Sequence, residues 1–465
     1  MPNISLASLG CSKNLVDSEV MLGQLTQAGY KIVTNHDEAD IIIVNTCAFI
    51  GPAKEESIET ILDLARFKED GRCNSLVVTG CMAQRYSHSL VTEMPEIDAV
   101  IGVHQYPQIV NLLERMLDRK DTLREIRRQP LPTDYSYPRI ITTPDHSVYL
   151  KIAEGCDRRC TFCIIPAIRG RQRSRTINSL VEEAQRLSEQ GAVELNLISQ
   201  DTTWYGKDLE VPVRLENLLE ALNSVNGIRW IRPLYNHPVR FTNRLIQSFA
   251  DLEKVCNYVD IPLQHISDAM LKRMNRETTS KKTRLLLDRI QKYISDVTLR
   301  TTFIVGFPGE TDEDFNELYN FVEETRFDRI GVFTYSKEDQ TPAADYGEQV
   351  SEQIKLERYN SLMALQREKS LERNRELIGK TVDVLIDEGS TEGEYKYVGR
   401  TISDAPDVDN EVLFTSKVEL PIGTFVPVTI TDALEYDLIG TVFPEGSKPN
   451  DNFTSTLPIR IESLV

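Results

Sequence analysis

The chain lacks long apolar runs, and no stretch approaches the roughly 20 residues that a membrane-spanning helix needs. Its first ten residues carry neither the basic region nor the cleavage signal of a secretory leader, and they are typical of a first core strand. Positive charge is also scarce, because 53 Lys and Arg stand against 71 Asp and Glu, a formal net charge of −18. Such a surface repels nucleic acid and attracts basic partners. We therefore expect a cytoplasmic globular protein without a membrane partner.

Cysteine is present in a pattern that indicates metal chemistry, because metal binding is commoner than disulfides in cytoplasmic proteins. Cys156, Cys160 and Cys163 lie within eight residues, directly after the apolar segment 148–153. Such tight cysteine runs typically hold iron–sulfur clusters. This run has three ligands rather than four and contains no histidine, so a four-iron cluster here would keep one iron open to a small molecule. The alternatives are a zinc knuckle with a distant fourth ligand, or three buried thiols.

The first hundred residues alternate between short apolar strands and helices. The expected strands are 4–9, 40–44, 75–79 and 97–103, and the expected helices are 14–28, 54–68 and 107–117. Wholly apolar strands are typical of a parallel sheet that is covered on both faces. The sequence therefore predicts an open, doubly wound α/β domain over residues 1–118.

Three further cysteines occupy matching positions in this domain, because Cys11, Cys47 and Cys81 each follow an expected strand. Ligands bind outside the carboxyl ends of strands in open α/β sheets, and loops after neighbouring strands can converge there. We therefore expect a second three-cysteine cluster. The alternative is that each is a small buried residue. Cys73 and Cys256 share no such position, and we interpret both as structural.

The rest of the chain divides by composition. Residues 119–146 are rich in charge and proline and predict a linker, whereas 147–377 predict a partial (β/α)6 barrel followed by a charged exit helix. Residues 378–448 predict a small five-stranded antiparallel barrel, and the tail 449–465 has no clear pattern. The expected strands of the larger barrel are 148–153, 193–198, 228–234, 255–262, 299–305 and 330–335.

Polar residues collect where the strands of the larger barrel are expected to end, which is the face where such barrels bind ligands. Together with a phenylalanine in the cysteine run, the candidate cofactor contacts are Phe162, Gln200, Asp201, Arg232, Gln264, His265, Gly306 and Pro308. The glycine-rich turn at 306–309 allows close backbone approach, and the helix after it favours an anion. Each feature alone is also explained by an ordinary turn or a buried polar pair. We assign no catalytic residue beyond the cluster ligands.

Four arginines follow the cysteine run at alternate positions, namely Arg169, Arg171, Arg173 and Arg175. They form either a solvated basic face or a contact with a carboxylate of the cofactor or of an acidic substrate residue.

The spacing Cys156-x3-Cys160-x2-Cys163 ahead of six strand–helix units resembles the radical S-adenosylmethionine superfamily. The resemblance implies that the open iron binds S-adenosylmethionine. One electron from a low-potential donor would then cleave this cofactor to a 5′-deoxyadenosyl radical, which abstracts hydrogen from an unactivated carbon.

The whole chain is similar to the methylthiotransferase family, since its terminal barrel resembles a TRAM domain. That resemblance implies two 4Fe–4S clusters, with the second cluster on Cys11, Cys47 and Cys81 for sulfur delivery and a second S-adenosylmethionine as methyl donor. The segments 10–19, 199–203, 234–238 and 335–338 resemble the branch that acts on a ribosomal protein. The implied substrate is one aspartate of ribosomal protein S-twelve, free or on the ribosome, modified on its β-carbon.

Charge agrees with that branch. Residues 379–448 contain five Lys or Arg and fourteen Asp or Glu, a net charge of −9. An RNA-binding barrel presents positive charge to phosphates, so we expect no direct tRNA binding and a basic ribosomal protein as partner. The alternatives are the same chemistry on a tRNA adenosine, and a non-enzymatic iron–sulfur sensor or ribosome-binding module.

Overall fold

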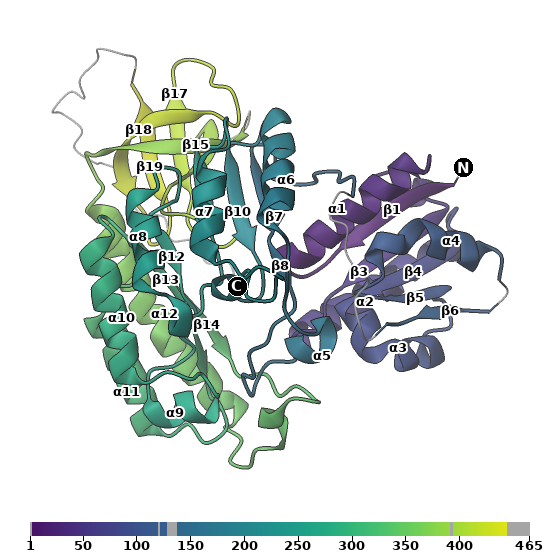
Figure 1. The fold of residues 1–465 in the computed structure, drawn as a ribbon, viewed down its shortest axis with the longest axis horizontal. Coiled ribbons are helices and arrows are strands. Elements are labelled where there is room, and N and C mark those ends of the chain that lie inside the picture. The colour runs from purple at the N-terminus through teal and green to yellow at the C-terminus, as the bar shows by residue number, and fades with distance from the viewer. Residues whose placement is uncertain (1, 120, 128–136, 391–393, 444–465) are drawn as a thin grey trace. The chain divides into compact units, whose positions relative to one another are not determined.

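Residues 2–119, 121–127, 137–390 and 394–443 are described by the computed structural model of the chain (Figure 1). They fall into two units. Unit 1 comprises Met1–Ser370 with Ile402–Asp409, and unit 2 comprises Leu371–Thr401 with Asn410–Val465. The domain boundaries drawn from the sequence stay predictions, and the tail 449–465 lies outside the described residues.

The first sheet of unit 1 has the strand order β2-β1-β3-β4-β5-β6, and every pair in it is parallel. Its strands are β1 (Asn3–Ser8), β2 (Lys31–Ile32), β3 (Ile41–Thr46), β4 (Ser75–Gly80), β5 (Ala99–Gly102) and β6 (Leu123–Glu125). Its helices are α1 (Ser12–Gln27), α2 (Gly51–Ala65), α3 (Cys81–Glu93) and α4 (Ile109–Leu117), with short 3-10 turns at His36–Glu38, Arg66–Lys68 and Tyr106–Gln108.

Alternate residues of β3 pack against opposite layers of helices. Ile42 and Val44 join a core with α2 and α3, whereas Ile41 and Ile43 join one with α1 and α4. The sheet is therefore covered on both faces, which explains why its central strands are wholly apolar. The prediction of an open, doubly wound α/β domain is confirmed.

Six parallel strands form the second part of unit 1. They lie in two sheets, β11-β10-β7 and β12-β13-β14, joined by a parallel bridge between Ile231 and Val255. The strands are β7 (Ser147–Lys151), β10 (Glu194–Ile198), β11 (Trp230–Pro233), β12 (Tyr258–Asp260), β13 (Thr298–Val305) and β14 (Arg329–Thr334). Its main helices are α6 (Ile177–Glu189), α7 (Leu215–Asn223), α8 (Asn243–Asp251), α9 (Asp268–Arg273), α10 (Ser280–Tyr293), α11 (Asp312–Glu324) and α12 (Glu352–Arg375). One large apolar core joins these strands and all of these helices except α9, so the partial (β/α)6 barrel is confirmed.

Smaller elements surround the cysteine run, and the sequence predicted none of them. They are β8 (Ala153–Glu154), α5 (Ile165–Arg169) and β9 (Arg173–Ser174). β8 and β9 pair antiparallel and close the base of the loop that carries the three thiols.

The segment Ile402–Asp409 belongs to unit 1 although it lies between strands of unit 2. It is held by ion pairs of Arg329 with Asp404 at 2.7 Å and of Arg300 with Asp409 at 3.2 Å. The sequence counted these carboxylates with the terminal barrel. The negative charge of that barrel is therefore smaller than its sequence indicates.

Unit 2 contains a closed barrel in the order β15-β16-β17-β19-β18. Its strands are β15 (Thr381–Gly389), β16 (Tyr397–Thr401), β17 (Val412–Ser416), β18 (Phe425–Ala433) and β19 (Leu438–Val442). Four of its pairs are antiparallel and the β17–β19 pair is parallel. The small barrel is confirmed, but the expectation of purely antiparallel pairing was wrong for this pair. Among the residues listed above as described, no helix combines the length and apolarity needed to cross a membrane.

Candidate active site

The loop with Cys156, Cys160 and Cys163 follows β8, beyond the carboxyl end of β7. Gly155 has φ +80°, and a Cβ there would lie 2.2 Å from the backbone oxygen of Arg171. The Cys156 N–H donates to the backbone oxygen of Gly170 at 3.1 Å. A glycine is thus needed where the loop returns across its own base.

The residues that follow α9 hold the loop from its other side. The Thr161 N–H donates to the Met274 oxygen at 3.1 Å, and Asn275 Nδ2 donates to the Arg159 oxygen at 2.8 Å. Arg276 Nη1 lies 3.4 Å from Cys160 Sγ. The first two contacts hold the loop through its backbone. The contact of Arg276 is the one among these three that involves a thiol.

Burial disfavours the thiolate form of two of these cysteines. It raises the pKa of Cys156 and of Cys163 to about 12, and the neighbouring thiols add to the rise. Within the described residues no three His, Cys, Asp or Glu side chains converge tightly enough to hold a single metal ion. A four-iron cluster makes a different demand, because each thiolate binds a separate iron.

Arg158 links this loop to the end of β10. Its Nε donates to Asp201 Oδ2 and its Nη1 to Glu277 Oε2, both at 2.8 Å, and its guanidinium lies 4.5 Å from the Trp204 ring. Gln200 Nε2 donates to an oxygen of Glu154, two residues before the first thiol, at 2.9 Å. The predicted residues Gln200 and Asp201 therefore do lie beside the cysteine loop.

Several buried polar atoms around this loop have no hydrogen-bond partner among the described residues. They are Arg158 Nη2, Gln172 Oε1 and Nε2, Ser199 Oγ, Gln200 Oε1 and Arg276 Nε. Leaving a buried polar atom unsatisfied costs roughly 1–3 kcal/mol, so such atoms are rarely gathered in one place. Their concentration beside three thiols fits a site whose polar ligand supplies the missing partners.

The turn at 306–309 is occupied by the protein itself. A Cβ on Gly306 would lie 2.2 Å from Lys355 Cγ of α12, and the backbone oxygen of Pro308 accepts from Arg273 Nε at 3.0 Å. A lysine stem thus fills the space on the Cβ side of Gly306, and whether Gly306 or Pro308 contacts a cofactor stays a prediction.

Three other candidates are held by ordinary packing. Phe162 packs against the apolar cluster around Met270 and Phe307. Gln264 has φ +73° and pairs through its backbone with β13. His265 is fully buried, its Nδ1 accepts from the Ser267 N–H at 3.0 Å, and burial lowers its pKa to about 3. Whether any of these residues contacts a cofactor stays a prediction.

Arg232 does not lie with the cysteine loop. Its guanidinium pairs with Glu194, the first residue of β10, at 3.0 Å and donates to the Ile402 oxygen at 2.7 Å. The side chain therefore points towards the amino ends of the strands. Its predicted place at the opposite rim was wrong, because an alternating strand pattern does not reveal in which direction a long side chain leans.

The second set of thiols lies where β1, β3 and β4, which are neighbours in the sheet, end. Cys11 is the N-cap of α1, Cys47 follows β3 and Cys81 begins α3. Gly10 has φ +87°, and a Cβ there would lie 3.0 Å from Cys47 Sγ. The loops after these strands thus meet as expected, while the ligand role of the thiols stays a prediction.

Arg169 connects the two sets of thiols. Its Nη2 donates to Asn14 Oδ1 at 2.5 Å and lies 3.6 Å from Cys81 Sγ. Its Nη1 pairs with Glu154 at 2.8 Å and with Asp17 at 3.2 Å. Burial raises the pKa of Cys81 to about 12, and the guanidinium opposes that rise.

Lys151 completes this buried group of charges. It pairs with Asp17 of α1, a helix that packs on the first sheet, and with Glu154 at 3.0 Å. Lys151, Asp17 and Glu154 were not predicted as site residues from the sequence. The available signal was the presence of Lys151 and Glu154 in an otherwise apolar strand segment, where charged residues are rare unless they are paired.

The four arginines after the cysteine run do not act alike. Arg171 is exposed beside Asp157, as expected for a solvated face, whereas Arg175 is buried and pairs with Glu183 at 2.5 Å. Arg169 binds carboxylates of the protein itself.

Comparisons with known proteins agree with this arrangement. Residues 3–102 match a family described as uncharacterized protein family UPF0004, residues 150–322 match the radical SAM superfamily, and residues 378–443 match the TRAM domain. The chain is 49% identical to ribosomal protein uS12 methylthiotransferase RimO of Desulforamulus reducens over 95% of this chain and 99% of that protein. It is also 49% identical to the protein of the same name from Geobacter sulfurreducens, over 94% and 98%. The chain belongs to the uS12 methylthiotransferase family.

Solved structures extend the comparison to the fold. The radical S-adenosylmethionine methyltransferase TsrM from Kitasatospora setae superposes with a TM-score of 0.55 at 14% identity, over 84% of this chain and 79% of that one. At this identity the likeness concerns the fold alone.

Membership of the uS12 methylthiotransferase family bears out the predicted enzyme class and cofactors. The enzyme is a radical S-adenosylmethionine methylthiotransferase, with two 4Fe–4S clusters and S-adenosylmethionine as cofactors. Two groups of three thiols and the unsatisfied polar atoms beside one of them fit these groups.

Proposed function

We propose that this enzyme methylthiolates the β-carbon of one aspartate of ribosomal protein uS12, the S-twelve protein of the sequence prediction. The observation that carries the proposal is the presence of two groups of three thiols, one in a single loop and one shared by three strand ends, each beyond the carboxyl ends of a parallel sheet. Buried Arg169 connects the two groups. Relatives at 49% identity, matched over 98–99% of their length, are named ribosomal protein uS12 methylthiotransferases.

The two thiol groups have separate roles in this proposal. Cys156, Cys160 and Cys163 hold the cluster at which S-adenosylmethionine is cleaved, and the radical formed removes hydrogen from the substrate carbon. Cys11, Cys47 and Cys81 hold the cluster that serves sulfur delivery. The spacing of the first group and the convergence of the second at neighbouring strand ends support this division.

Residues beside the first group have binding roles. The unsatisfied atoms of Gln200 and Ser199 offer hydrogen bonds to the polar groups of S-adenosylmethionine. Arg158, fixed between Asp201 and Glu277, orients the loop and presents Nη2 towards an anionic group such as a carboxylate. Cys156 and Arg158 of the loop are buried, which limits the access of water to that part of the site.

The partners follow from charge and chemistry. A basic ribosomal protein, free or on the ribosome, is attracted by a chain of net charge −18, and tRNA is not. A low-potential donor supplies the reducing electron. A reaction on a ribosomal protein takes place in the cytoplasm.

Cysteine variants test the division of roles in reconstituted enzyme under strictly anaerobic conditions. Replacing Cys156, Cys160 or Cys163 with Ala abolishes cleavage of S-adenosylmethionine. Replacing Cys11, Cys47 or Cys81 with Ala abolishes sulfur transfer to uS12 while some cleavage survives. Complete loss of cleavage in both sets contradicts separate roles, and no cleavage by the wild-type enzyme under strong reductant favours a non-enzymatic sensor.

Nucleoside analysis of total tRNA separates the substrates. We expect the tRNA of a deletion strain to keep every methylthio nucleoside of the parent strain. Loss of such a nucleoside, with the mass of uS12 unchanged, would support the tRNA alternative.

A further inference from the structure

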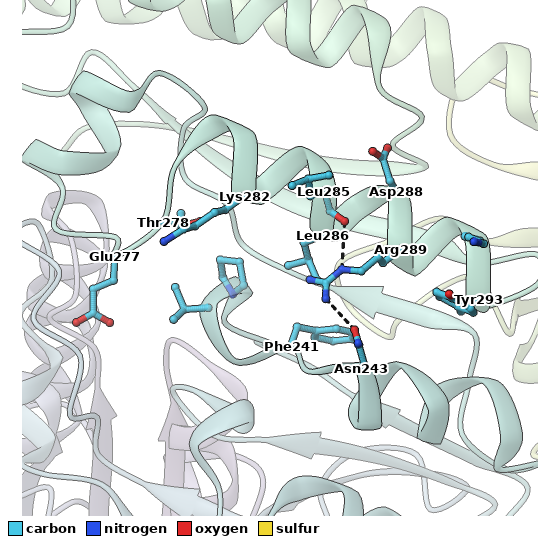
Figure 2. Close-up of a pocket in the computed structure, with 13 residues that line it drawn as sticks. Phe241, Asn243, Glu277, Thr278, Lys282, Leu285, Leu286, Asp288, Arg289 and Tyr293 are labelled. Atoms are coloured by element: carbon cyan, nitrogen blue, oxygen red, sulfur yellow. Dashed lines mark hydrogen bonds between the residues drawn. The ribbon is translucent and has the colours of Figure 1, made fainter.

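A groove of about 690 Å³ runs along helix α10 in unit 1, between that helix and the start of α8 (Figure 2). It is lined by residues of two segments, namely Pro238, Val239, Phe241, Asn243, Glu277, Thr278, Lys282, Leu285, Leu286, Asp288, Arg289, Lys292 and Tyr293. Figure 2 shows Arg289 of α10 reaching Asn243, the first residue of α8, to which it donates at 2.7 Å. This bond ties the two helices together beneath the groove.

Apolar side chains of the groove are left open to solvent. Leu285 and Tyr293 are each 53% exposed and Val239 is 42% exposed, whereas Leu286 and Phe241 below them are buried. Exposed apolar side chains that gather in one groove with a polar rim are typical of protein-binding surfaces.

The charge of this surface is opposite to that of the chain. Helix α10 carries five Lys or Arg and one Asp, a net charge of +4 on a chain of net charge −18. Lys281, Lys282 and Lys292 are exposed, and within the described part of the chain none of them forms an ion pair. Lys282 and Lys292 line the groove, together with Arg289, Glu277 and Asp288, so its lining has a net charge of +1. Unpaired lysines beside an apolar groove attract an acidic partner and repel a basic one.

One end of the groove adjoins the cysteine loop. Glu277 lines the groove and accepts a hydrogen bond from Arg158 at 2.8 Å. Arg158 lies two residues after Cys156, and its backbone N–H is 3.4 Å from that Cys156 Sγ. A partner seated in the groove thus comes close to the site that receives the reducing electron.

We propose that this groove is the docking surface of a small acidic electron-transfer protein. The inference rests on the proposed function, which requires one electron at the Cys156–Cys163 loop. The centre carried by the partner loses one electron and the site on the loop gains it, while no proton or chemical group is transferred. The basic substrate uS12 is repelled from α10, so the two partners are directed to different surfaces of the enzyme.

A charge-reversal experiment on the cluster-loaded enzyme tests the proposal, with a flavodoxin, an acidic protein that carries one FMN, as the probe. The test variant is K281E/K282E/K292E. The control variant K31E/K380E/K417E changes net charge equally at three lysines that are exposed elsewhere. We expect the dissociation constant for flavodoxin to rise roughly tenfold or more in the test variant only, with a weaker dependence on salt.

Two reductants separate docking from chemistry. With flavodoxin as reductant the test variant cleaves S-adenosylmethionine more slowly than wild type, whereas with dithionite, which needs no docking surface, both cleave it at the same rate. Equal flavodoxin affinities of the test and control variants overturn the proposal. A second outcome also overturns the proposal. In it, wild type does not bind flavodoxin but binds a short RNA duplex, and the test variant loses that RNA binding. No cleavage by wild type with dithionite would instead overturn the proposed function and the electron-transfer role with it.

Discussion

At the scale of single residues, Arg169 connects the two groups of thiols. Its side chain is 1% exposed. The guanidinium contacts Cys81 of the first sheet's domain and Glu154, which lies two residues before Cys156. A buried charge is stable only where it has a partner of opposite charge. The ion pairs of Arg169 therefore depend on each of the buried carboxylates that it contacts.

Replacing Arg169 with Met leaves the buried carboxylates of Asp17 and Glu154 with Lys151 as their remaining cation. We expect unit 1 to lose roughly 3–5 kcal/mol of unfolding free energy, which urea denaturation measures. Arg171→Met is the matched control, because its side chain is 89% exposed, and we expect its urea midpoint to equal that of wild type. A midpoint for Arg169→Met equal to wild type would contradict the account of this network.

His265 makes stability depend on acid. Its pKa is lowered to about 3 by burial, with Asp314 opposing that change and Arg358 adding to it. The imidazole is therefore neutral, and its 3.9 Å contact with Glu310 is not an ion pair. Because the folded pKa is below the unfolded value, the contribution is complete above about pH 6.5 and is lost as pH falls towards 3, with about 2 kcal/mol lost at pH 5.

The variant His265→Asn keeps an acceptor for the Ser267 N–H but cannot titrate. Its unfolding free energy, measured at pH 8, gives the packing cost alone. We expect the difference between wild type and variant to shrink by about 2 kcal/mol between pH 8 and pH 5. A difference that is constant over this range would show that His265 does not carry the acid sensitivity.

At the scale of elements, the junction between β4 and α3 sets the position of Cys81. Gly80 has φ +95°, and a Cβ there would lie 2.3 Å from Asn45 Oδ1 and 2.5 Å from the Thr46 oxygen. Any side chain at this position pushes apart the strand ends that carry Cys47 and Cys81.

The variant Gly80→Ala should therefore fail to bind the cluster of Cys11, Cys47 and Cys81. It should still bind the cluster of the Cys156–Cys163 loop. We expect the reconstituted variant to hold about half the iron of wild type, measured by colorimetric iron analysis. Gly191→Ala is the control, because Gly191 also has positive φ, at +113°, but no atom lies within 4 Å of the added Cβ. Full iron content in Gly80→Ala would mean that the junction tolerates a side chain.

Strongly patterned elements were predictable from the sequence, and short or tertiary ones were not. The helix expected over 107–117 was found as α4 (Ile109–Leu117), because its apolar residues share one buried face. The strand expected over 193–198 was found as β10 (Glu194–Ile198). Strand β6, three residues long, fell in the predicted linker. Helix α3 (Cys81–Glu93) was not predicted, and its backbone departs from helical geometry at Tyr86.

The site could be predicted from the sequence where its residues lie next to the ends of predicted strands. Residues next to strand ends, such as Gln200 and Asp201, were placed beside the cysteine loop correctly. Arg232 was misplaced, because Ile402, whose backbone oxygen holds its guanidinium, is distant in sequence. Long-range pairing leaves no local trace in a single sequence.

At the scale of the whole molecule, charge separates the partners. The chain carries −18 overall, while α10 carries +4. In our proposal a basic substrate and an acidic electron donor therefore approach different surfaces, and neither competes with the other.

Salt titration of binding tests this separation. We expect the affinity of uS12 for the enzyme to fall steadily as sodium chloride rises from 50 to about 300 mM, since screening weakens attraction between opposite charges. Total tRNA in the same assay should show no saturable binding. Affinity for uS12 that is independent of salt would contradict an electrostatic basis for substrate choice.

The central claim is that this enzyme methylthiolates uS12, and the most direct test is the intact mass of that protein. We would purify uS12 from the parent strain, from a deletion strain, and from the deletion strain complemented with wild type or with Cys81→Ala. The account predicts that uS12 carries one methylthio group in the parent and wild-type-complemented strains, at a single aspartate, and none in the other two. An unchanged mass of uS12 in the deletion strain would contradict it.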